Sequence, residues 1–378
     1  MKTPTILYVA PITDEKISGL TVSIPNTVRA LHNRGIKVAL LTTSNKGPYK
    51  KDMPFPVFYI RNDNGKLKKL CQLPLPFSKP DIIIFQSTYI PIHFSLAKEA
   101  NKRGIPYVIT PRGGMTIGAQ SQKKVKKKIG NFLFFNRMVK NAVAIHCLNE
   151  AESKDVSKWR TETFVVGNGT ELVEAKVLSD TKSKKESKNE MNFVFIGRLD
   201  IYHKGLDLLI EGCSKIKKQL KLMNVKVNLY GPDINNSKKE LERLIELNSL
   251  TEIINVHGPV VGSDKELILQ DADIFVHTSR FEGHPMSVLE AMSYGIPCLV
   301  TPGTNILDEV VEKKVGWGTS FDSDNIAQVL TEIINSKENV ASYGTRAKRL
   351  IKEKYTWDRV AEQLLDNFYG ILKIKKEN

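Results

Sequence analysis

The sequence lacks the features that mark membrane-spanning, secreted and metal-binding proteins. No apolar run in its 378 residues approaches the ~20 needed to span a bilayer. The cysteines are few and far apart, without metal-ligand spacing, at Cys71, Cys147, Cys213 and Cys298. The first residues pass from Met1 through a short apolar stretch into Pro11 and Asp14, which indicates a first strand rather than a signal peptide. We therefore expect free thiols in a reducing cytosol, and a cytoplasmic protein.

No zinc-finger spacing and no aromatic RNA-binding signature accompany the basic charge of this chain. Its 56 Lys and Arg residues against 41 Asp and Glu residues leave a formal net charge of +15. Such a charge predicts an anionic partner, which can be a phosphorylated substrate, an anionic membrane surface or a nucleic acid. The missing signatures argue against nucleic acid, and no histidine and carboxylate pattern suggests a metal site. A basic surface without a specific partner is the alternative.

Apolar strand-like runs alternate with longer amphipathic stretches, which is typical of parallel sheets covered by helices on both faces. In the first half, strands are expected at Thr5–Ala10, Lys37–Thr42, Val57–Ile60, Asp81–Phe85, Tyr107–Thr110, Ala142–Leu148 and Thr163–Val166. In the second half, they are expected at Asn192–Gly197, Lys226–Tyr230, Ile253–His257, Asp273–His277, Pro297–Thr301 and Gly316–Thr319. Helices are expected between them at Leu20–Asn33, Ile92–Arg103, Gln122–Lys140, Glu150–Lys158, Gly205–Leu220, Ser237–Asn248, Asp264–Gln270 and Pro285–Tyr294.

The alternation breaks between Gly167 and Glu190, where the stretch from Ser179 onward is polar, charged and without periodicity. A chain of this length suits two domains of ordinary size. The expected division is an N-terminal domain at 1–170, a linker at 171–190, a second domain at 191–355, and a C-terminal segment at 356–378.

The expected fold class is α/β, with two doubly wound, Rossmann-like domains facing a central cleft. Ligands of such sheets bind beyond the carboxyl ends of the strands. The C-terminal segment contains an expected helix at about Trp357–Lys373, which we expect to return to the N-terminal domain.

Three motifs stand where the chain is expected to enter a helix. The first, Ile17–Val22, has a glycine turn at Gly19. The second, Gly197–Gly205, follows the first strand of the second domain and carries Arg198 and Lys204. The third, Phe281–Glu290, places Glu282 on a loop and Glu290, after seven intervening residues, inside the following helix. Pro285 suits the first position of that helix, where a missing N–H costs nothing.

The three motifs suit a ligand that has both phosphate and hydroxyl groups. Gly19 permits close approach of the backbone to a diphosphate. Arg198 can grip phosphate oxygens bidentately, while Lys204 adds a mobile point charge. Glu282 and Glu290 surround a helix start, whose unpaired amides and dipole favour anions. An anion site at a helix start with two carboxylates around it predicts a nucleotide sugar as the ligand.

In this order, the motifs resemble those of the retaining glycosyltransferases of family 4, which have the GT-B fold. The resemblance is strongest over residues 190–320 and implies that Arg198 and Lys204 hold the donor diphosphate. It implies that Glu282 faces the transferred sugar and that Glu290 binds the ribose. It also implies backbone contacts to the donor from Gly283, His284, Met286, Ser287 and Val288. The family generally needs no divalent ion, so we expect no metal and no cofactor beyond the nucleotide-sugar co-substrate.

The expected acceptor side, in the first domain, departs from the family pattern. Many relatives have a His-Gly pair after the strand that corresponds to Tyr107–Thr110, whereas this chain has Arg112 and Gly113 there. A Pro-Arg-Gly variant resembles a subgroup that builds cell-surface polysaccharides. Arg112 can stabilise a diphosphate, bind an anionic acceptor or serve only as a structural turn arginine. His203, just before Lys204, is a further acceptor-side candidate.

The resemblance implies a metal-independent, retaining hexosyltransferase. It would move a sugar, most often from a UDP-sugar in this family, to a hydroxyl of a glycan or lipid-linked saccharide in cell-surface polysaccharide biosynthesis. Its catalytic residues would be Arg198, Lys204 and Glu282. A GT-B nucleotide-sugar epimerase is one alternative, although it usually carries different acid–base residues. A non-catalytic binding module for an anionic polymer is the alternative outside enzymes.

A basic helix expected at Gln122–Lys140 suggests a membrane face. At about 100° per residue, one stripe should face the core, consisting of Val125, Ile129, Phe132 and Val139. The opposite side combines apolar and basic residues, namely Phe134, Met138, Lys123 and Lys127. Such a face is typical of helices that dock on anionic membranes, so peripheral association with the inner face of the membrane is a hypothesis. A solvated helix whose Phe134 packs under a loop is the alternative.

Overall fold

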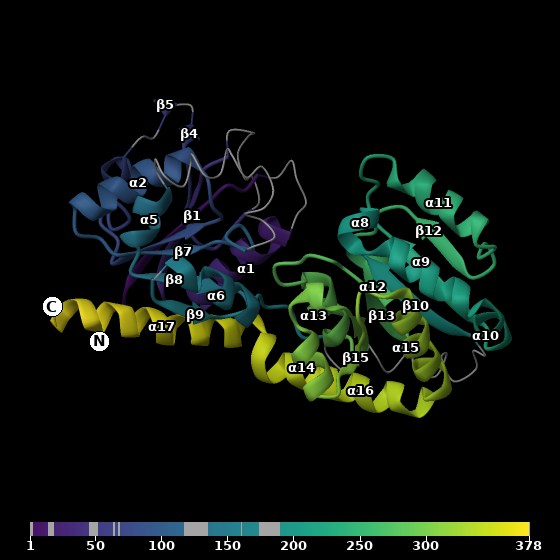
Figure 1. The fold of residues 1–378 in the computed structure, drawn as a ribbon. Coiled ribbons are helices and arrows are strands. Elements are labelled where there is room, and N and C mark those ends of the chain that lie inside the picture. The colour runs from purple at the N-terminus through teal and green to yellow at the C-terminus, as the bar shows by residue number, and fades with distance from the viewer. Residues whose placement is uncertain are drawn as a thin grey trace. The chain divides into compact units, whose positions relative to one another are not determined.

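The computed structural model of the protein describes residues 3–13, 19–44, 52–62, 65–66, 69–116, 135–159, 161–173 and 190–377. The chain forms two compact units. The N-terminal unit consists of Met1–Gly169 together with Trp357–Asn378, and the C-terminal unit consists of Thr170–Thr356. Each unit is built around a parallel sheet with helices packed on it (Figure 1).

The sheet of the N-terminal unit has seven parallel strands. Their order across the sheet is β3 (Val57–Tyr59), β2 (Lys37–Thr42), β1 (Thr5–Ala10), β6 (Ile82–Gln86), β7 (Tyr107–Thr110), β8 (Ala144–Cys147) and β9 (Thr163–Val165). A short antiparallel pair lies outside this sheet, β4 (Arg61–Asn62) with β5 (Gly65–Lys66). The strand order reverses between β1 and β6, the point at which open parallel sheets bind their ligands.

Helix α17, at the end of the chain, belongs to the N-terminal unit. The helices described in this unit are α1 (Gly19–Asn33), α2 (Pro91–Lys102), α5 (Asn136–Lys140), α6 (Glu150–Val156) and α17 (Trp357–Glu377). Arg34, just after α1, donates two hydrogen bonds to the Asp358 carboxylate of α17, at 2.7 and 2.9 Å. Phe368 of α17 is fully buried and meets Phe164 of β9 edge-on, with 6.3 Å between ring centroids. A core contact and a surface ion pair therefore attach α17 to this unit.

The sheet of the C-terminal unit has six parallel strands. Their order is β12 (Ile254–His257), β11 (Val225–Tyr230), β10 (Met191–Ile196), β13 (Ile274–His277), β14 (Cys298–Val300) and β15 (Gly316–Gly318). The order reverses between β10 and β13. The loops that follow these two strands therefore begin side by side at the carboxyl edge of the sheet.

Helices cover both faces of this second sheet. They are α8 (Ile201–Lys204), α9 (Leu206–Lys215), α10 (Lys217–Leu222), α11 (Ser237–Leu247), α12 (Gly262–Asp271), α13 (Met286–Ser293), α14 (Leu307–Glu312), α15 (Ser323–Asn335) and α16 (Lys337–Leu350). Phe193 and Phe195 of β10 pack in one core cluster with α9, α11 and α15. Val194 and Ile196 of the same strand pack in another with α12, α13, α14 and α16. Because neighbouring residues of a strand point to opposite faces, the two clusters lie on opposite sides of the sheet.

The expected fold class is confirmed at the level of the two parallel sheets, and every expected strand is present to within two residues at each end. Most strands were predictable because they are continuous apolar runs that are buried on both faces, such as β1, β6 and β7. The helices were predicted less completely, because α14, α15 and α16 were not expected. The expected helix at Gly205–Leu220 is interrupted at Ile216, where α9 ends and α10 begins. The expectation for Pro285 was also wrong, because it is the N-cap residue before α13 rather than the first helical residue.

The expected membrane-facing helix cannot be followed, because residues 117–134 lie outside the described residues. Its last turn is α5, where Val139 is buried in the core of the N-terminal unit, as expected. Met138 is buried in the same core, so its expected position on the outer face was wrong. The packing of α5 against α2 explains this, because the neighbouring helix covers a side that the isolated helical wheel leaves open. No helix in the described parts of the chain combines the length and apolar character of a bilayer span.

We predict that Gly231→Ala destabilises the C-terminal unit. Gly231 follows β11, and a Cβ atom there would lie 1.6 Å from the carbonyl oxygen of Gly197. The oxygen belongs to the backbone and the Cβ position is set by its own backbone, so neither atom can move cheaply. The free energy of unfolding should therefore fall by about 3 kcal/mol. Urea unfolding measures the loss. The matched control is Gly258→Ala, where nothing lies within 4 Å of the added Cβ. Equal losses in the two variants would contradict the steric explanation.

We also predict that the N-terminal unit loses stability as the pH falls below about 6.5, the ordinary pKa of histidine. Burial lowers the pKa of His93 to about 3 and that of His146 to about 4, so both stay neutral when folded. The unfolded chain binds these protons first, so each histidine should cost roughly 1 kcal/mol between pH 7.5 and 5.5. Urea unfolding at the two pH values measures this cost. His93→Gln should reduce the difference between them, and an unchanged difference would refute its assignment to buried histidines.

Candidate active site

The motif residues of the C-terminal unit gather at the carboxyl edge of β10 and β13. Arg198 follows β10, and the short helix α8 then brings in Lys204. Asp200 caps α8 by accepting a hydrogen bond from the His203 amide at 3.1 Å. Gly205 ends α8 with a φ of +61°, and a Cβ atom there would lie 2.0 Å from the carbonyl oxygen of Thr278. Glycine therefore lets the segment that carries Lys204 lie directly against the loop after β13.

The centre of this arrangement is an ion pair between Lys204 and Glu282. The Lys204 ammonium donates to Oε1 of Glu282, and both side chains are largely buried, with 10% and 14% exposed. Nε2 of His277 and the hydroxyl of Ser279 lie within hydrogen-bond distance of the same oxygen, each at 3.0 Å. All three contacts use Oε1. Within the described part of the chain, Oε2 of Glu282 has no hydrogen-bond partner and is available to a ligand hydroxyl.

The surroundings keep Glu282 ionised. Burial by itself would raise the pKa of Glu282, but the hydrogen bond from His277 and the positive charge of Lys204 outweigh it and lower the pKa below its ordinary value. Burial lowers the pKa of His277, although the hydrogen bond with Glu282 opposes this shift. A neutral His277 that donates Nε2–H to the carboxylate accounts for both directions. Its other ring nitrogen is buried and has no partner among the described residues.

Arg198 contrasts with Lys204. Its side chain is exposed and forms no hydrogen bond or ion pair within the described residues. Burial lowers the pKa of His203, and the charges of Lys204 and Arg198 lower it further, so two cations lie close to this imidazole. The site thus has one cation held by a carboxylate and a second that is free to meet an anion.

Arg280, immediately before Phe281, ties the loop after β13 to the segment of α8 and α9. Its guanidinium donates to both carboxylate oxygens of Asp207, at 2.7 and 2.8 Å, and to the carbonyl of Tyr202 at 2.8 Å. Its amide donates to the carbonyl of His203 at 3.0 Å. These bonds fix the two chain segments that carry Lys204 and Glu282. Sequence reasoning did not identify Arg280 or Asp207 as site residues.

The start of α13 presents backbone rather than side chains. Pro285 caps the helix, and the amides of Met286 and Ser287 lie in the first turn, where helical geometry provides no acceptor. His284 is buried against the ring of Tyr355, with 5.5 Å between ring centroids, and Val288 is buried in the core. The side chains of His284 and Val288 are therefore not available to a ligand, and the Val288 amide donates to the Pro285 carbonyl at 3.1 Å. Another residue missed from the sequence, Asn305, supports this segment by donating to the carbonyl oxygen of Glu282 at 2.5 Å.

Glu290 lies inside α13 and forms an ion pair with Lys265 of α12. The Glu290 side chain is 32% exposed, so a ligand can still reach its carboxylate. The sequence analysis did not identify Lys265 as the partner of Glu290. A hydroxyl that binds Glu290 would share or displace this lysine.

Arg112 and Gly113, two of the three expected acceptor-side residues, belong to a polar cluster in the N-terminal unit. Arg112 has a φ of +52° and donates to Gln86 at 2.7 Å, and its Nη1 donates to Ser23 at 3.0 Å and to Asn168 at 3.1 Å. Burial lowers the pKa of Arg112 to about 10. Its guanidinium thus links β6, α1 and the segment after β9, which fits a structural part as well as a ligand-binding one.

The amide of Gly113 is hydrogen-bonded to a buried carboxylate. Glu152 of α6 accepts from the amide of Gly113 at 2.5 Å and from that of Leu148 at 2.8 Å. Burial raises the pKa of Glu152, while these two hydrogen bonds oppose the shift. Gly19, the remaining donor-side candidate, is the first residue of α1 and is exposed, while 14–18 lie outside the described residues. The structure therefore brings Arg198, Lys204, Glu282 and His203 together in one unit, whereas Gly19, Arg112 and Gly113 belong to the other.

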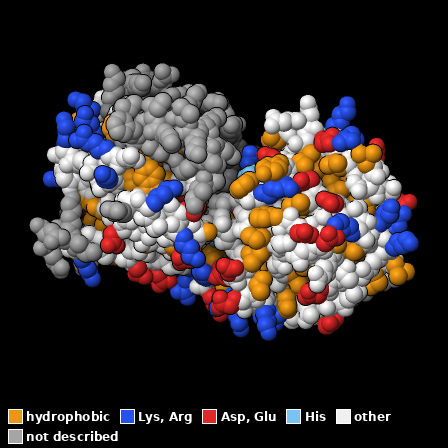
Figure 2. Space-filling model, in the orientation of Figure 1, with side chains coloured by type: hydrophobic (Ala, Val, Ile, Leu, Met, Phe, Trp, Pro, Cys, Tyr) orange, Lys and Arg blue, Asp and Glu red, His pale blue; other side chains and the backbone are white. Residues whose placement is uncertain are grey.

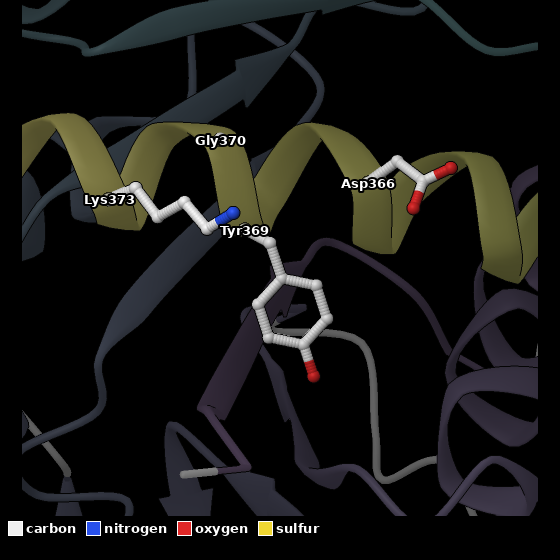
Figure 3. Close-up of a pocket in the computed structure, with 4 residues that line it drawn as sticks. All are labelled: Asp366, Tyr369, Gly370 and Lys373. Carbon is white, nitrogen blue, oxygen red and sulfur yellow. The ribbon is translucent and has the colours of Figure 1, made fainter. Parts of the chain in front are cut away.

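A pocket on α17 is unrelated to these clusters. Figure 3 shows it on one helix, with the ring of Tyr369 projecting from α17 and Asp366 and Lys373 on the same helix. None of its lining residues belongs to a motif, so it is not the candidate active site. Among the described residues, no group of three or more His, Cys, Asp or Glu side chains could hold a metal ion.

Comparison with known proteins matches each unit to a family of glycosyltransferases. Residues 17–174 match the family described as Glycosyltransferase Family 4, and residues 177–350 match the family described as Glycosyl transferases group 1. The chain is 24% identical over 333 residues to the poly(ribitol-phosphate) alpha-N-acetylglucosaminyltransferase of Staphylococcus aureus, covering 86% of this chain and 60% of the relative. It is 27% identical over 191 residues to the putative colanic acid biosynthesis glycosyltransferase WcaL of Salmonella typhimurium, covering 48% of this chain and 46% of the relative. The chain thus spans about half the length of these curated relatives.

The fold also resembles that of solved structures. Anabaena HepE in complex with UDP matches with a TM-score of 0.76 and 16% sequence identity, over 97% of this chain and 100% of that chain. At this identity, the likeness concerns the fold. Together with the two parallel sheets, it confirms the expected GT-B fold class.

We predict that the Arg280–Asp207 pair stabilises the C-terminal unit more than an exposed pair of the same geometry does. Arg280→Ala should lower the free energy of unfolding by about 1–2 kcal/mol, because charge-assisted hydrogen bonds to a partly buried carboxylate and a carbonyl are lost. Urea unfolding provides the measurement. The control is Arg243→Ala, which breaks the solvent-exposed pair with Glu240 on α11 and should cause no measurable loss. Similar losses at both positions would show that Arg280 contributes no more than a surface charge.

Proposed function

The chain belongs to the glycosyl transferases group 1 family, and from this membership we propose that it is a retaining glycosyltransferase. It transfers a hexose from a nucleotide-diphosphate sugar, most simply a UDP-sugar, to a hydroxyl of a glycan or lipid-linked saccharide. The observation that carries this proposal is the Glu282 carboxylate, which keeps one oxygen unpartnered in the described chain while its other oxygen holds Lys204 beside the exposed Arg198.

In this proposal the donor diphosphate binds to Arg198, Lys204 and the free amides at the start of α13. Positive side chains and unpaired main-chain donors are the usual partners of phosphate oxygens. The ribose hydroxyls bind Glu290, and a hydroxyl of the transferred sugar binds Oε2 of Glu282. Gly19 in the N-terminal unit also contributes to the donor site, through its backbone. The Lys204–Glu282 and Lys265–Glu290 ion pairs hold these two carboxylates in place.

The proposed reaction takes place on the leaving-group face of the sugar. The acceptor oxygen forms a bond to the anomeric carbon while the bond from that carbon to the diphosphate oxygen breaks. The departing phosphate takes the proton of the acceptor hydroxyl, so no side chain has to act as base. Arg198 and Lys204 stabilise the negative charge that develops on the diphosphate, and Glu282 stabilises positive charge near the anomeric centre.

The acceptor is proposed to bind through Arg112 and Gly113 of the N-terminal unit and through His203. The positive charge of Arg112 and the net charge of +15 favour an acceptor that carries phosphate or another anionic group. The names of the Staphylococcus and Salmonella relatives, which refer to poly(ribitol phosphate) and colanic acid, support a cell-surface polymer as the product. We further propose that the protein works in the cytoplasm at the inner face of the membrane, where a lipid-linked acceptor would be located.

We predict that UDP binds the wild-type protein and that Arg198→Ala and Lys204→Ala each weaken this binding about tenfold or more, because a charge-assisted contact to phosphate is lost. Isothermal titration calorimetry with UDP provides the measurement. Lys221→Ala, which removes a lysine exposed at the end of α10, is the matched control and should leave the affinity unchanged. Equal affinity in wild type and both site variants would refute the proposed diphosphate site.

We predict that Glu282→Gln lowers the rate at which UDP is released from a UDP-sugar substrate roughly 100-fold, because a neutral amide cannot stabilise developing positive charge. Its affinity for UDP should change much less, since Glu282 is assigned to the sugar. Release of UDP from a panel of UDP-hexoses, with and without added glycans, provides the measurement. Interconversion of the UDP-hexoses without release would favour an epimerase. UDP release by the variant at the wild-type rate would contradict the role of Glu282.

A further inference from the structure

Two exposed aromatic rings stand beside the candidate site and have no part in the proposed donor contacts. Tyr202, two residues before Lys204, is 64% exposed, and Phe281, immediately before Glu282, is 45% exposed. Their ring centroids are 6.3 Å apart and the ring planes are tilted by 45°. Large apolar side chains that stay exposed next to a functional site often mark a binding surface. Figure 2 shows other apolar side chains on the visible face of the C-terminal unit, so exposure alone does not distinguish Tyr202 and Phe281.

The distinguishing feature of Tyr202 and Phe281 is that their surroundings hold them in place. The guanidinium of Arg280 lies 4.5 Å from the centroid of the Tyr202 ring and is itself bound to Asp207 and to the Tyr202 carbonyl. The ring of His203 is stacked near Phe281, at 6.3 Å and 17°. These contacts restrict both aromatic rings, which lowers the entropy that binding a ligand would cost.

The position of the pair indicates which part of a substrate it would meet. Tyr202 lies on α8, whose neighbour α9 covers one face of the sheet. Glu290, the proposed ribose ligand, lies on α13, which covers the opposite face with α12. The Lys204–Glu282 pair lies between, at the carboxyl edge of the strands. A donor that runs from the ribose through the diphosphate to its sugar therefore ends at Lys204 and Glu282, before it reaches the aromatic rings.

We propose that Tyr202 and Phe281 form a stacking platform for a sugar ring of the acceptor saccharide, next to the transferred sugar. This inference rests on the proposed glycosyl transfer and extends it, since it assigns an acceptor subsite to the C-terminal unit. The chemistry suits a pyranose, because one face of such a ring consists of C–H bonds, which carry partial positive charge. That face packs against the electron-rich face of an aromatic ring, while the hydroxyls at the edge stay in water.

Saturation-transfer NMR tests the platform with methyl glycosides of glucose, galactose, mannose and N-acetylglucosamine as probes, in the presence of saturating UDP. When aromatic protons of the wild-type protein are irradiated, saturation should be transferred to the C–H protons of at least one probe. Tyr202→Ala and Phe281→Ala should each raise the dissociation constant of that probe roughly fivefold, the loss of one ring contact. Tyr202→Phe keeps the ring and should bind the probe as the wild type does. Leu247→Ala, which removes another exposed apolar side chain, on α11, is the matched control.

UDP affinity separates failure of the platform from failure of the proposed function. Both alanine variants should bind UDP as the wild type does, because the diphosphate contacts are untouched. If UDP binds but no probe receives saturation, or if saturation persists unchanged in both variants, the platform is refuted and the glycosyltransferase proposal stands. If the variants lose UDP affinity as strongly as probe affinity, the rings serve the donor and the acceptor assignment is wrong. If the wild type does not bind UDP, both proposals fail.

Discussion

The candidate site depends on one buried contact, the ion pair between the Lys204 ammonium and the Glu282 carboxylate. A charge that is removed from water is costly unless it is paired and hydrogen-bonded. Oε1 of Glu282 meets this requirement through Lys204, His277 and Ser279 together. Separating the loop after β13 from the segment after β10 would leave buried charges unpaired, and this free-energy penalty keeps the two segments together. The ionised carboxylate of Glu282 is thus held in position, and its Oε2 has no hydrogen-bond partner among the described residues.

Much of the surrounding structure supports that contact. Gly205 allows the backbones to meet, Arg280 joins the same two segments through Asp207, and Asn305 holds the carbonyl of Glu282. Preorganised charges and dipoles stabilise a transition state without having to reorganise during the reaction, which is the main electrostatic resource of an enzyme. The support also explains why two aromatic rings can stay exposed beside the site. The guanidinium of Arg280 lies over the Tyr202 ring, and the ring of His203 is stacked near Phe281.

The two units use one architecture for different chemistry. Both are parallel sheets with a reversal of strand order, and both gather polar residues at the carboxyl edge next to it. In the C-terminal unit the gathered charges are Arg198, Lys204 and Glu282, which suit a diphosphate sugar. In the N-terminal unit the half-buried Arg112 donates to neutral oxygen acceptors of Gln86, Ser23 and Asn168. The carboxylate that acts on its charge is Glu152, which is itself hydrogen-bonded to two backbone amides.

The sequence by itself determined the strands, the two-sheet α/β class and the three motifs. These features are local: an apolar run buried on both faces, or a glycine and a cation just after a strand, is visible without knowing what lies nearby. Tertiary structure alone decided which groups meet. Lys204 and Glu282 are 78 residues apart, and Arg280 and Asp207 are 73 apart, so spacing could identify the first pair as site residues but not as partners. For the same reason Lys265, Asn305 and the aromatic pair went unrecognised, and Met138 was placed outside a core that a neighbouring helix closes. Pairing of charges and covering of faces are set by energies between distant segments, and these become defined only when the sheet brings its strand ends together.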